Sequence, residues 1–296
     1  QQSILNSQYS TVNTQQSILN SQQSTVNSQY PMIAQQCLAM KLKALEMALN
    51  TGSTGTHIGG AFSAMEILAA LYSVANVDMN SEARDRIIIS KGHGVLALYT
   101  ALWQHGFITE DELRTFDTNG TKLHGHPHRC LERGIEFSGG SLGLGISYAV
   151  GVAMACKLKG LNNKVYVLVG DGECDEGIVW ESLMAIAHHK LSNVVVIVDR
   201  NNWQLDGPVA EIMDNGPLEA KFAAFGFNVD VVDGHDIDQL LDCYNKVCDG
   251  PRAIIADTVK ANGLSFLMNK KKSHWCAITK EEYDTAVEEI MNAYGC

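Results

Sequence analysis

Short apolar runs alternate with longer stretches of helical periodicity from residue 33 onward. Runs of strand length and apolar or β-rich character occur at residues 86–90, 165–169, 193–199, 228–234 and 253–259. Helical patterns occur at residues 33–50, 64–74, 95–104, 146–158 and 175–189, and further helices are expected between the last two apolar runs and after Thr279. Strands that are apolar throughout are typical of a parallel sheet covered on both faces. We therefore expect an α/β fold, with a doubly wound, mainly parallel sheet and helices on both faces.

Two irregular stretches interrupt this pattern. The segment THIGGAFS at residues 56–63 breaks the helical periodicity with glycines, and residues 117–145 are rich in Gly and His. Neither has the character of a linker. We therefore expect a single domain over residues 32–296.

The first 31 residues differ from the rest of the chain. QQSILNSQ begins at Gln1 and again at Gln15, and the segment contains no charged residue. Such a segment cannot bury enough apolar surface to offset its ordering entropy. We interpret residues 1–31 as a low-complexity leader that is disordered or was added to the natural sequence; a native interaction tail is the alternative.

The composition narrows the possible partners. The net charge of −11 disfavours nucleic acid and anionic membranes, although backbone N–H groups and a metal ion can still bind a small anion locally. The eight cysteines form no C-x-x-C pair, so we expect reduced thiols and a cytoplasmic location. No apolar run of about 18 residues and no signal-peptide pattern is present, so no membrane partner is expected.

Polar residues end two successive apolar runs. Asp171 follows the run at 165–169 between two glycines, and Asn201 and Asn202 follow the next run. Asp171 and Asn201 are thirty positions apart, which is about the length of one βαβ crossover, so both should emerge at the same edge of the sheet. Their oxygen atoms suit Mg²⁺ or Ca²⁺, and the helix after Asp175 points its N-terminus at the same place. This pattern predicts a metal-anchored diphosphate site; a turn without any metal is the alternative.

A Gly-Asp-Gly followed about thirty residues later by Asn-Asn resembles the signature of thiamine-diphosphate enzymes. Further motifs are similar to the N-terminal region of transketolases, in the order Thr56-His57-Ile58-Gly59-Gly60, Ser90-Lys91-Gly92-His93, Gly125-His126-Pro127 and Gly140-Ser141-Leu142-Gly143-Leu144-Gly145. The resemblance covers residues 48–263 and implies the diphosphate-binding (PP-type) domain of the thiamine-diphosphate-binding fold. The chain departs from the family at Thr56, Ser141 and Leu144, where Gly, Pro and Gln are usual.

The resemblance implies a role for each matching residue. The metal would be held by Asp171, Asn201 and the backbone carbonyl of Trp203. The cofactor would contact His93, Gly140, Ser141, Leu142, Asp171, Gly172, Glu173 and Asn201. The substrate would face His57, His126 and His274, although the order His274-Trp275 is the reverse of the usual one. Two acidic positions, Glu176 and Glu181, would lie near the cofactor at a subunit interface.

The resemblance also implies the activity and a partner. A two-carbon ketol unit would pass from a ketose, bearing a phosphate or otherwise modified, to an aldose. In the family a second domain grips the aminopyrimidine of the cofactor, so we expect a separate C-terminal subunit, a heterotetramer, and no activity without that partner. An α subunit of a 2-oxoacid dehydrogenase E1 component and a non-catalytic subunit of the same fold are the alternatives.

The remaining histidines are given other interpretations. His124, His126 and His128 alternate, which on a strand would place all three on one face and offer a metal site, but the flanking Gly and Pro favour a loop. His188 and His189 are expected to compensate the dipole at a helix end. His105 and His235 are expected to be ordinary loop histidines.

Overall fold

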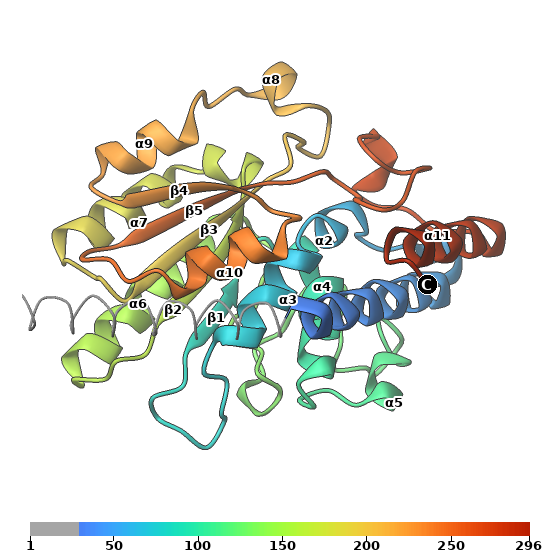
Figure 1. Cartoon of the computed structure of the whole chain (residues 1–296), viewed down its shortest axis with the longest axis horizontal. Coiled ribbons are helices and arrows are strands. Elements are labelled where there is room, and N and C mark those ends of the chain that lie inside the picture. The colour runs from blue at the N-terminus through green and yellow to red at the C-terminus, as the bar shows by residue number, and fades with distance from the viewer. Residues whose placement is uncertain (1–29) are drawn as a thin grey trace, which may run out of the picture.

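The computed structural model describes residues 30–296, so the predicted leader lies outside the described residues except for residues 30 and 31, which open a helix at 30–50. One five-stranded sheet has the order β1-β2-β3-β5-β4, and all its neighbouring strands are parallel (Figure 1). The strands are β1 (Arg86–Ile89), β2 (Val165–Gly170), β3 (Val194–Arg200), β4 (Asn228–Asp233) and β5 (Arg252–Asp257). This confirms the expected fold class.

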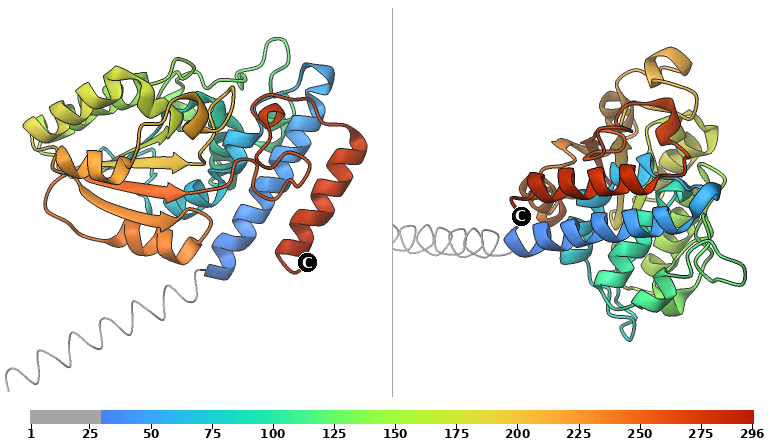
Figure 2. Two further views of the ribbon diagram at one scale, coloured as in Figure 1. Left: turned by 90° about the horizontal axis from the view of Figure 1, so that it is seen from above. Right: turned by 90° about the vertical axis from the view of Figure 1, so that its right-hand side faces the viewer.

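Helices cover both faces of the sheet. One face carries α6 (Leu144–Leu158), α7 (Gly177–His188) and α9 (Leu218–Ala224). The other face carries α3 (Met65–Val74), α4 (Val95–Gln104) and α10 (Ile237–Asn245). Outside this second layer, the helix at 30–50 lies beside α11 (Lys280–Ala293), as both figures show (Figures 1 and 2).

The central strands β2, β3 and β5 are largely apolar because each supplies side chains to two cores, whereas the edge strand β4 carries Asp230 and Asp233. Along β2, Tyr166 and Leu168 belong to the core under α3 and α10, whereas Val165, Val167 and Val169 belong to the core under α6 and α7. Side chains of a strand point alternately to opposite faces, so a strand covered on both sides has no position left for a polar residue.

The differences from the predicted elements are all in short segments. A four-residue helix, α2 (Gly59–Phe62), lies within the glycine-rich stretch, and neither α5 (Glu110–Leu113) nor α8 (Val209–Ile212) was predicted. Helix α9 was also missed. Brief 3-10 turns lie at Gly52–Thr54, Gly92–Gly94, Leu131–Arg133, Gly172–Asp175 and Lys271–Ser273. A helix of one or two turns repeats its pattern too few times for periodicity to reveal it.

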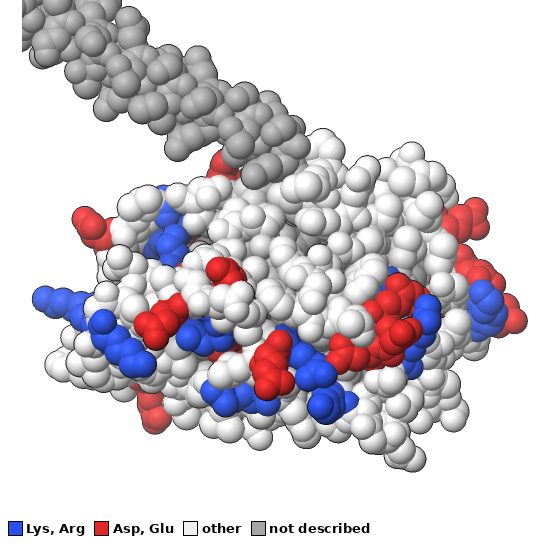
Figure 3. Space-filling view, turned by 90° about the horizontal axis from the view of Figure 1, so that it is seen from below, with Lys and Arg blue, Asp and Glu red and all other residues white. Residues whose placement is uncertain are grey.

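The underside of the molecule in Figure 1, around α5, carries positive and negative side chains next to one another (Figure 3). Glu110 there pairs with Lys43 at 3.0 Å and with Arg114 at 3.1 Å, and Arg114 also reaches Asp111 at 3.1 Å. The charges on this face therefore largely offset one another. Among the helices of residues 30–296, none combines the length and the apolar character needed to cross a bilayer.

Candidate active site

A pocket of about 350 Å³ opens at the edge of the sheet where the strands end. Its wall includes most of the predicted site residues, namely His57, His93, His126, Gly140, Leu142, Asp171, Gly172, Glu173, Glu176, Asn201, Trp203 and His274. They belong to the loops after β1, β2, β3 and β5, to the start of α2, and to the irregular stretch before α6. Ligands of open parallel sheets bind at this carboxyl edge.

Asp171 and Asn201 lie together at one end of the pocket because β2 and β3 are parallel neighbours. One carboxylate oxygen of Asp171 accepts a hydrogen bond from the backbone N–H of Asn202 at 2.6 Å. The other oxygen accepts from the N–H of Gly172 at 2.8 Å. The carboxylate of the first loop therefore reaches the turn that carries the carboxamide.

The turn after β3 explains why two asparagines follow the strand. Asn202 has a φ of 60°, in the left-handed region that asparagine enters more readily than most other residues. The side-chain oxygen of Asn201 accepts from the N–H of Trp203 at 3.1 Å. This tight turn keeps the Asn201 side chain and the Trp203 backbone beside Asp171.

The carboxylate of Asp171 has no ion-pair partner within residues 30–296. Burial raises the pKa of Asp171 to about 7, and the neighbouring carboxylate of Asp199 acts in the same direction. Asp199 is itself paired with the fully buried ammonium group of Lys91. A buried carboxylate with a raised pKa lacks a strong positive partner. The oxygens at this end of the pocket are those that a hard divalent cation prefers, so the residues present fit such an ion.

Glu173 has both carboxylate oxygens engaged within the protein. One oxygen accepts from the hydroxyl of Ser90 and from the N–H of Gly143 at 2.7 Å, and the other accepts from the N–H of Gly170 at 3.0 Å. Gly145 packs so closely here that a Cβ would lie 2.5 Å from the Cα of Ser90. Glu173 therefore joins the loops after β1 and β2 to the start of α6 and shapes the pocket wall.

Four histidines gather at the other end of the pocket. The ring centre of His57 lies 4.9 Å from that of His126, 5.1 Å from that of His274 and 6.0 Å from that of His93. Burial lowers the pKa of His57 to about 3 and that of His274 to about 4, and it lowers the pKa values of His93 and His126 as well. All four imidazoles are therefore neutral at pH 7, when each has one donor and one acceptor nitrogen.

A family model described as "Transketolase, thiamine diphosphate binding domain" matches residues 33–295. The chain belongs to the transketolase family. In that family it corresponds to the domain that binds thiamine diphosphate, as the order of the sequence motifs implied.

Relatives named as subunits and full-length transketolases are both similar to this chain. The 6-deoxy-6-sulfo-D-fructose transketolase subunit SqwG of Clostridium sp. (strain MSTE9) is 39% identical over 241 residues, covering 79% of this chain and 88% of that protein. An apulose-4-phosphate transketolase subunit of Actinobacillus succinogenes is 38% identical over 265 residues, covering 86% of this chain and 96% of that protein. Human transketolase is 30% identical over 259 residues, covering 86% of this chain and 41% of that protein.

The solved structures agree with this pattern of coverage. The transketolase of Campylobacter jejuni superposes with a TM-score of 0.81 at 28% identity, covering 89% of this chain and 42% of that chain. The present chain therefore spans less than half the length of that transketolase, whereas it spans most of the length of the two relatives named as subunits.

Two lysines of this transketolase domain line the pocket, although the sequence does not identify them as site residues. Lys91 is part of one of the motifs, and Lys260 follows β5 in a segment with no distinctive pattern. Burial lowers the pKa of Lys260 to about 8, and the positive charge of Lys91 acts in the same direction. The ammonium group of Lys260 donates to the backbone carbonyl of Gln204 at 3.0 Å. Sequence spacing gives no signal for Lys260, because its place depends on the order of the strands.

Two predicted cofactor residues lie outside the pocket wall. Ser141 is exposed between Gly140 and Leu142, both of which line the pocket. Glu181 is exposed on the outer side of α7, beyond Glu176 at the pocket rim. Contact between these two residues and the cofactor stays a prediction.

The other histidines of this transketolase chain fall into separate environments. His126 faces His57, whereas His124 and His128 stack on each other at 4.2 Å, so the three do not share one face and the alternative metal site is not formed. His235 is not the ordinary loop histidine that the sequence indicates. One of its ring nitrogens, Nδ1, lies 3.1 Å from a carboxylate oxygen of Glu66, which is buried.

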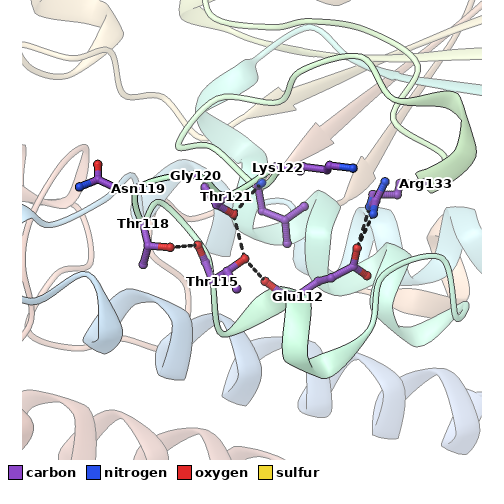
Figure 4. A pocket seen from close by; sticks show the side chains of 9 residues that line it. Glu112, Thr115, Thr118, Asn119, Gly120, Thr121, Lys122 and Arg133 are labelled. Atoms are coloured by element: carbon purple, nitrogen blue, oxygen red, sulfur yellow. Dashed lines mark hydrogen bonds and ion pairs between the residues drawn. The ribbon is translucent and has the colours of Figure 1, made fainter.

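A second hollow of about 310 Å³ lies beside α5 (Figure 4). Figure 4 shows that the hydroxyls of Thr115 and Thr121 contact each other, at 2.9 Å, and that Arg133 pairs with Glu112 at 2.6 Å. None of the predicted site residues lines this hollow, and four of its polar side chains are already paired, Thr115 with Thr121 and Glu112 with Arg133. We assign it no ligand.

Proposed function

We propose that this chain is the diphosphate-binding subunit of a two-chain transketolase-type enzyme. It would transfer a two-carbon ketol unit from a ketose to an aldose, with thiamine diphosphate and Mg²⁺ (or Ca²⁺) as cofactors. The observation that carries the proposal is one pocket with Asp171 and Asn201 at one end and four neutral histidines at the other. The end with oxygen ligands suits a metal and a diphosphate, and the end with imidazoles suits a sugar.

We assign the diphosphate to the end of the pocket near Asp171 because of the charges there. Asp171, Asn201 and the carbonyl of Trp203 would hold the metal, which would supply the missing positive charge beside the Asp171 carboxylate. Lys260 and the N–H groups that follow Gly172 would face the diphosphate oxygens. When bound, thiamine diphosphate supplies the nucleophilic carbon that carries the two-carbon unit.

The histidines would handle the substrate. His57, His126 and His274 surround a space beyond the diphosphate end, and neutral imidazoles can both donate a hydrogen bond to a sugar hydroxyl and accept a proton from it. This arrangement supports proton movement at the hydroxyls next to the bond that breaks.

The partner would be a C-terminal subunit that supplies the pyrimidine-binding domain, and the assembly a heterotetramer. The two relatives named as subunits support a second chain. Leu144 at the start of α6 and Met184 on α7 have side chains that are 46% and 53% exposed, and Glu176 just before α7 and Glu181 on it are exposed as well. Large exposed apolar side chains on two packed helices are typical of a protein interface.

The substrate class is taken from the same relatives. Their printed names specify a sulfonated ketose and a ketose phosphate, so we propose a ketose with one terminal anionic group as the donor. A cytoplasmic location is part of the proposal, supported by eight cysteines that are all free thiols.

The test is an assay of the full chain together with the second subunit encoded beside its gene. Transfer from a ketose phosphate to an aldose phosphate should depend on both subunits, thiamine diphosphate and Mg²⁺. A 2-oxoacid offered in parallel should not be decarboxylated at a comparable rate. Faster reaction with the 2-oxoacid would favour a 2-oxoacid dehydrogenase subunit, and no cofactor binding in the complex would favour a non-catalytic subunit.

A substitution at His126 tests whether this residue acts on the substrate and not on the cofactor. Replacing it with Ala should lower turnover by about 10²–10⁴-fold while the affinity for thiamine diphosphate changes by less than about threefold, because His126 lies at the sugar end of the pocket. Equal losses in turnover and cofactor affinity would contradict this assignment.

A further inference from the structure

A second group of buried charges lies behind the pocket and takes no part in its wall. Lys41, from the helix at 30–50, and Glu66, from α3, are 3% and 4% exposed and form an ion pair. The second oxygen of Glu66 lies 3.1 Å from Nδ1 of His235, which sits in the turn between β4 and α10. The three side chains therefore form a continuous relay from the outer layer to the edge of the sheet.

The tautomer of His235 follows from its other contact. The backbone N–H of Val259 lies 2.9 Å from Nε2 of His235, and a backbone N–H can only donate. Nε2 therefore carries the lone pair, and the proton of the neutral ring sits on Nδ1, where it is donated to Glu66. The side-chain amide of Asn262 is placed with its nitrogen 3.0 Å from Nδ1. Because Nδ1 carries the proton, this amide must be turned so that its oxygen accepts there as a second partner.

The turn that His235 holds is the one that carries Lys260. Val259 precedes Lys260, and Ala261 follows it with a φ of 62°, a left-handed conformation that is strained for alanine. The N–H of Ala261 is bonded to the carbonyl of Gly59 at 3.0 Å. A strained turn of this kind persists only where the surrounding contacts fix it, and the bond from Val259 to His235 is one of these contacts.

The close approach of the two turns is built into the sequence. A Cβ at Gly234 would lie 2.4 Å from Cγ2 of Thr258, so only glycine lets the β4–α10 turn pack against the end of β5. The N–H of Gly234 donates to the carbonyl of Asp257 at 2.7 Å. His235 is thereby brought to the residue that it must reach.

We propose that the relay Lys41–Glu66–His235 positions the turn Val259–Asn262 and so directs Lys260 into the diphosphate end of the pocket. His235 is a positioning residue, acting as a neutral acceptor for the Val259 N–H. The role of Lys260 toward a diphosphate rests on the proposed function, whereas the fixing of the turn does not. Lys260 needs such a support because, within residues 30–296, its ammonium group donates to a backbone carbonyl and otherwise faces the ring of Trp203 at 6.0 Å, without a carboxylate partner.

Two substitutions at one position separate the two hydrogen bonds of the ring. His235→Gln places an amide oxygen near the position of Nε2 and keeps an acceptor for Val259. His235→Asn places its amide near the position of Nδ1, which keeps the contact with Glu66 and leaves the Val259 N–H without an acceptor. Both variants remove the imidazole, so a general loss of packing affects them alike.

The first readout is hydrogen exchange of the amides at residues 258–264 in the full chain without cofactor. The exchange of this segment should speed up about tenfold in His235→Asn and by less than about threefold in His235→Gln, because only the former leaves the buried N–H unpaired. Equal exchange in the two variants, or exchange unchanged from the wild type in His235→Asn, would overturn the positioning role. This readout does not depend on the proposed function.

The second readout is the affinity for thiamine diphosphate with Mg²⁺, measured by titration of the chain with its partner subunit. His235→Asn should weaken binding about tenfold in the wild-type background and by less than about twofold in a Lys260→Met background. Equal losses in both backgrounds would show that the relay does not act through Lys260. If the wild type bound no cofactor, the proposed function would fail, and the exchange result would still decide whether His235 fixes the turn.

Discussion

Glu66 and Asp171 are buried to nearly the same degree, with exposed fractions of 4% and 5%. Although burial raises its pKa, Lys41 and His235 together lower the pKa of Glu66 to about 2. Burial and the neighbouring Asp199 raise the pKa of Asp171 to about 7. Groups of the chain itself therefore balance the negative charge of Glu66, whereas the negative charge of Asp171 would be balanced only by a bound ligand.

The difference between Glu66 and Asp171 distinguishes charges that stabilise the fold from charges that serve binding. Buried charges that serve the fold come with their counter-charges, whereas a binding site keeps charges that are unfavourable until the ligand arrives. Lys260 fits the second class, since its pKa is lowered to about 8 by burial and by the positive charge of Lys91. Substitutions in the two regions should accordingly have opposite signatures in stability and in binding.

The largest effect is expected from Glu66→Gln. It leaves the ammonium group of Lys41 buried without a counter-charge, so the free energy of unfolding should fall by about 3–5 kcal/mol. Urea unfolding of the full chain at pH 7 measures this loss. The double variant Lys41→Met/Glu66→Met, which removes both charges, should recover most of it. A loss of less than about 1 kcal/mol in Glu66→Gln would mean that the ion pair does not support the fold.

Asp171→Asn should have the reverse signature. The metal-dependent affinity for thiamine diphosphate should fall at least about 100-fold, because even residues behind a metal ligand often contribute 10–100-fold. The melting temperature should change little, since the substitution removes a charge that burial opposes. Asp257→Asn is the control, because this carboxylate ends β5 at the same edge but pairs with Arg200. Similar losses of affinity in the two variants would remove the basis for a metal at Asp171.

Lys260→Met tests whether Lys260, like Asp171, serves ligand binding and not the stability of the fold. Calorimetric titration of the complex should show an affinity for thiamine diphosphate that is about tenfold weaker, the loss expected for one charged hydrogen bond to phosphate. The melting temperature of the free chain at pH 7 should stay the same or rise. A clear fall in melting temperature with unchanged affinity would place Lys260 among the structural charges instead.

The proximity of Asp171 and Asn201 could be predicted from the sequence because it depends on adjacent strands. Two apolar runs with one crossover between them bring Asp171 and Asn201 to the same edge, and the structure has both there. Lys260 and His235 could not be predicted in this way. The last strand, β5, lies between β3 and β4, and only this order brings the segment after β5 to the site. Local periodicity carries no information on strand order.

The hydrogen-bond partners of the site side chains could not be predicted from the sequence either. Glu173 lines the pocket, and its contact with the cofactor stays a prediction; the hydrogen bonds that its carboxylate accepts from Ser90, Gly143 and Gly170, in three different segments, have no signal in the sequence. His235 was expected to be an ordinary loop residue and is bonded to Glu66, 169 positions away. Such partners are decided by packing between distant segments, and spacing along the chain does not encode them.

The smallest effect expected is the part of the pH dependence of stability that comes from the pocket histidines. His57 and His274 have folded-state pKa values near 3 and 4, below the ordinary value of 6.5, so the unfolded chain binds their protons first as the pH falls. The stability that they contribute is complete above about pH 6.5 and is lost as the pH falls toward 4. The pKa of Glu66 is lowered from 4.5 to about 2, so its contribution is lost only below about pH 4.5 and changes little between pH 7 and pH 5.

Thermal unfolding at pH 7 and pH 5 can measure this effect. It should be done in the Asp171→Asn background, because the raised pKa of Asp171 acts in the opposite direction over the same range. After allowance for solvent screening at His274, replacing His57 and His274 with Gln should recover about 1 kcal/mol of the stability lost between the two pH values, or about 2–4 °C. Replacing the exposed His188 at the end of α7 should recover none. If the loss of stability between pH 7 and pH 5 were the same with and without the His57 and His274 substitutions, the pocket histidines would be protonated as readily as in the unfolded chain. The contrast between the pocket and the ion pair of Lys41 with Glu66 would then rest on Asp171 alone.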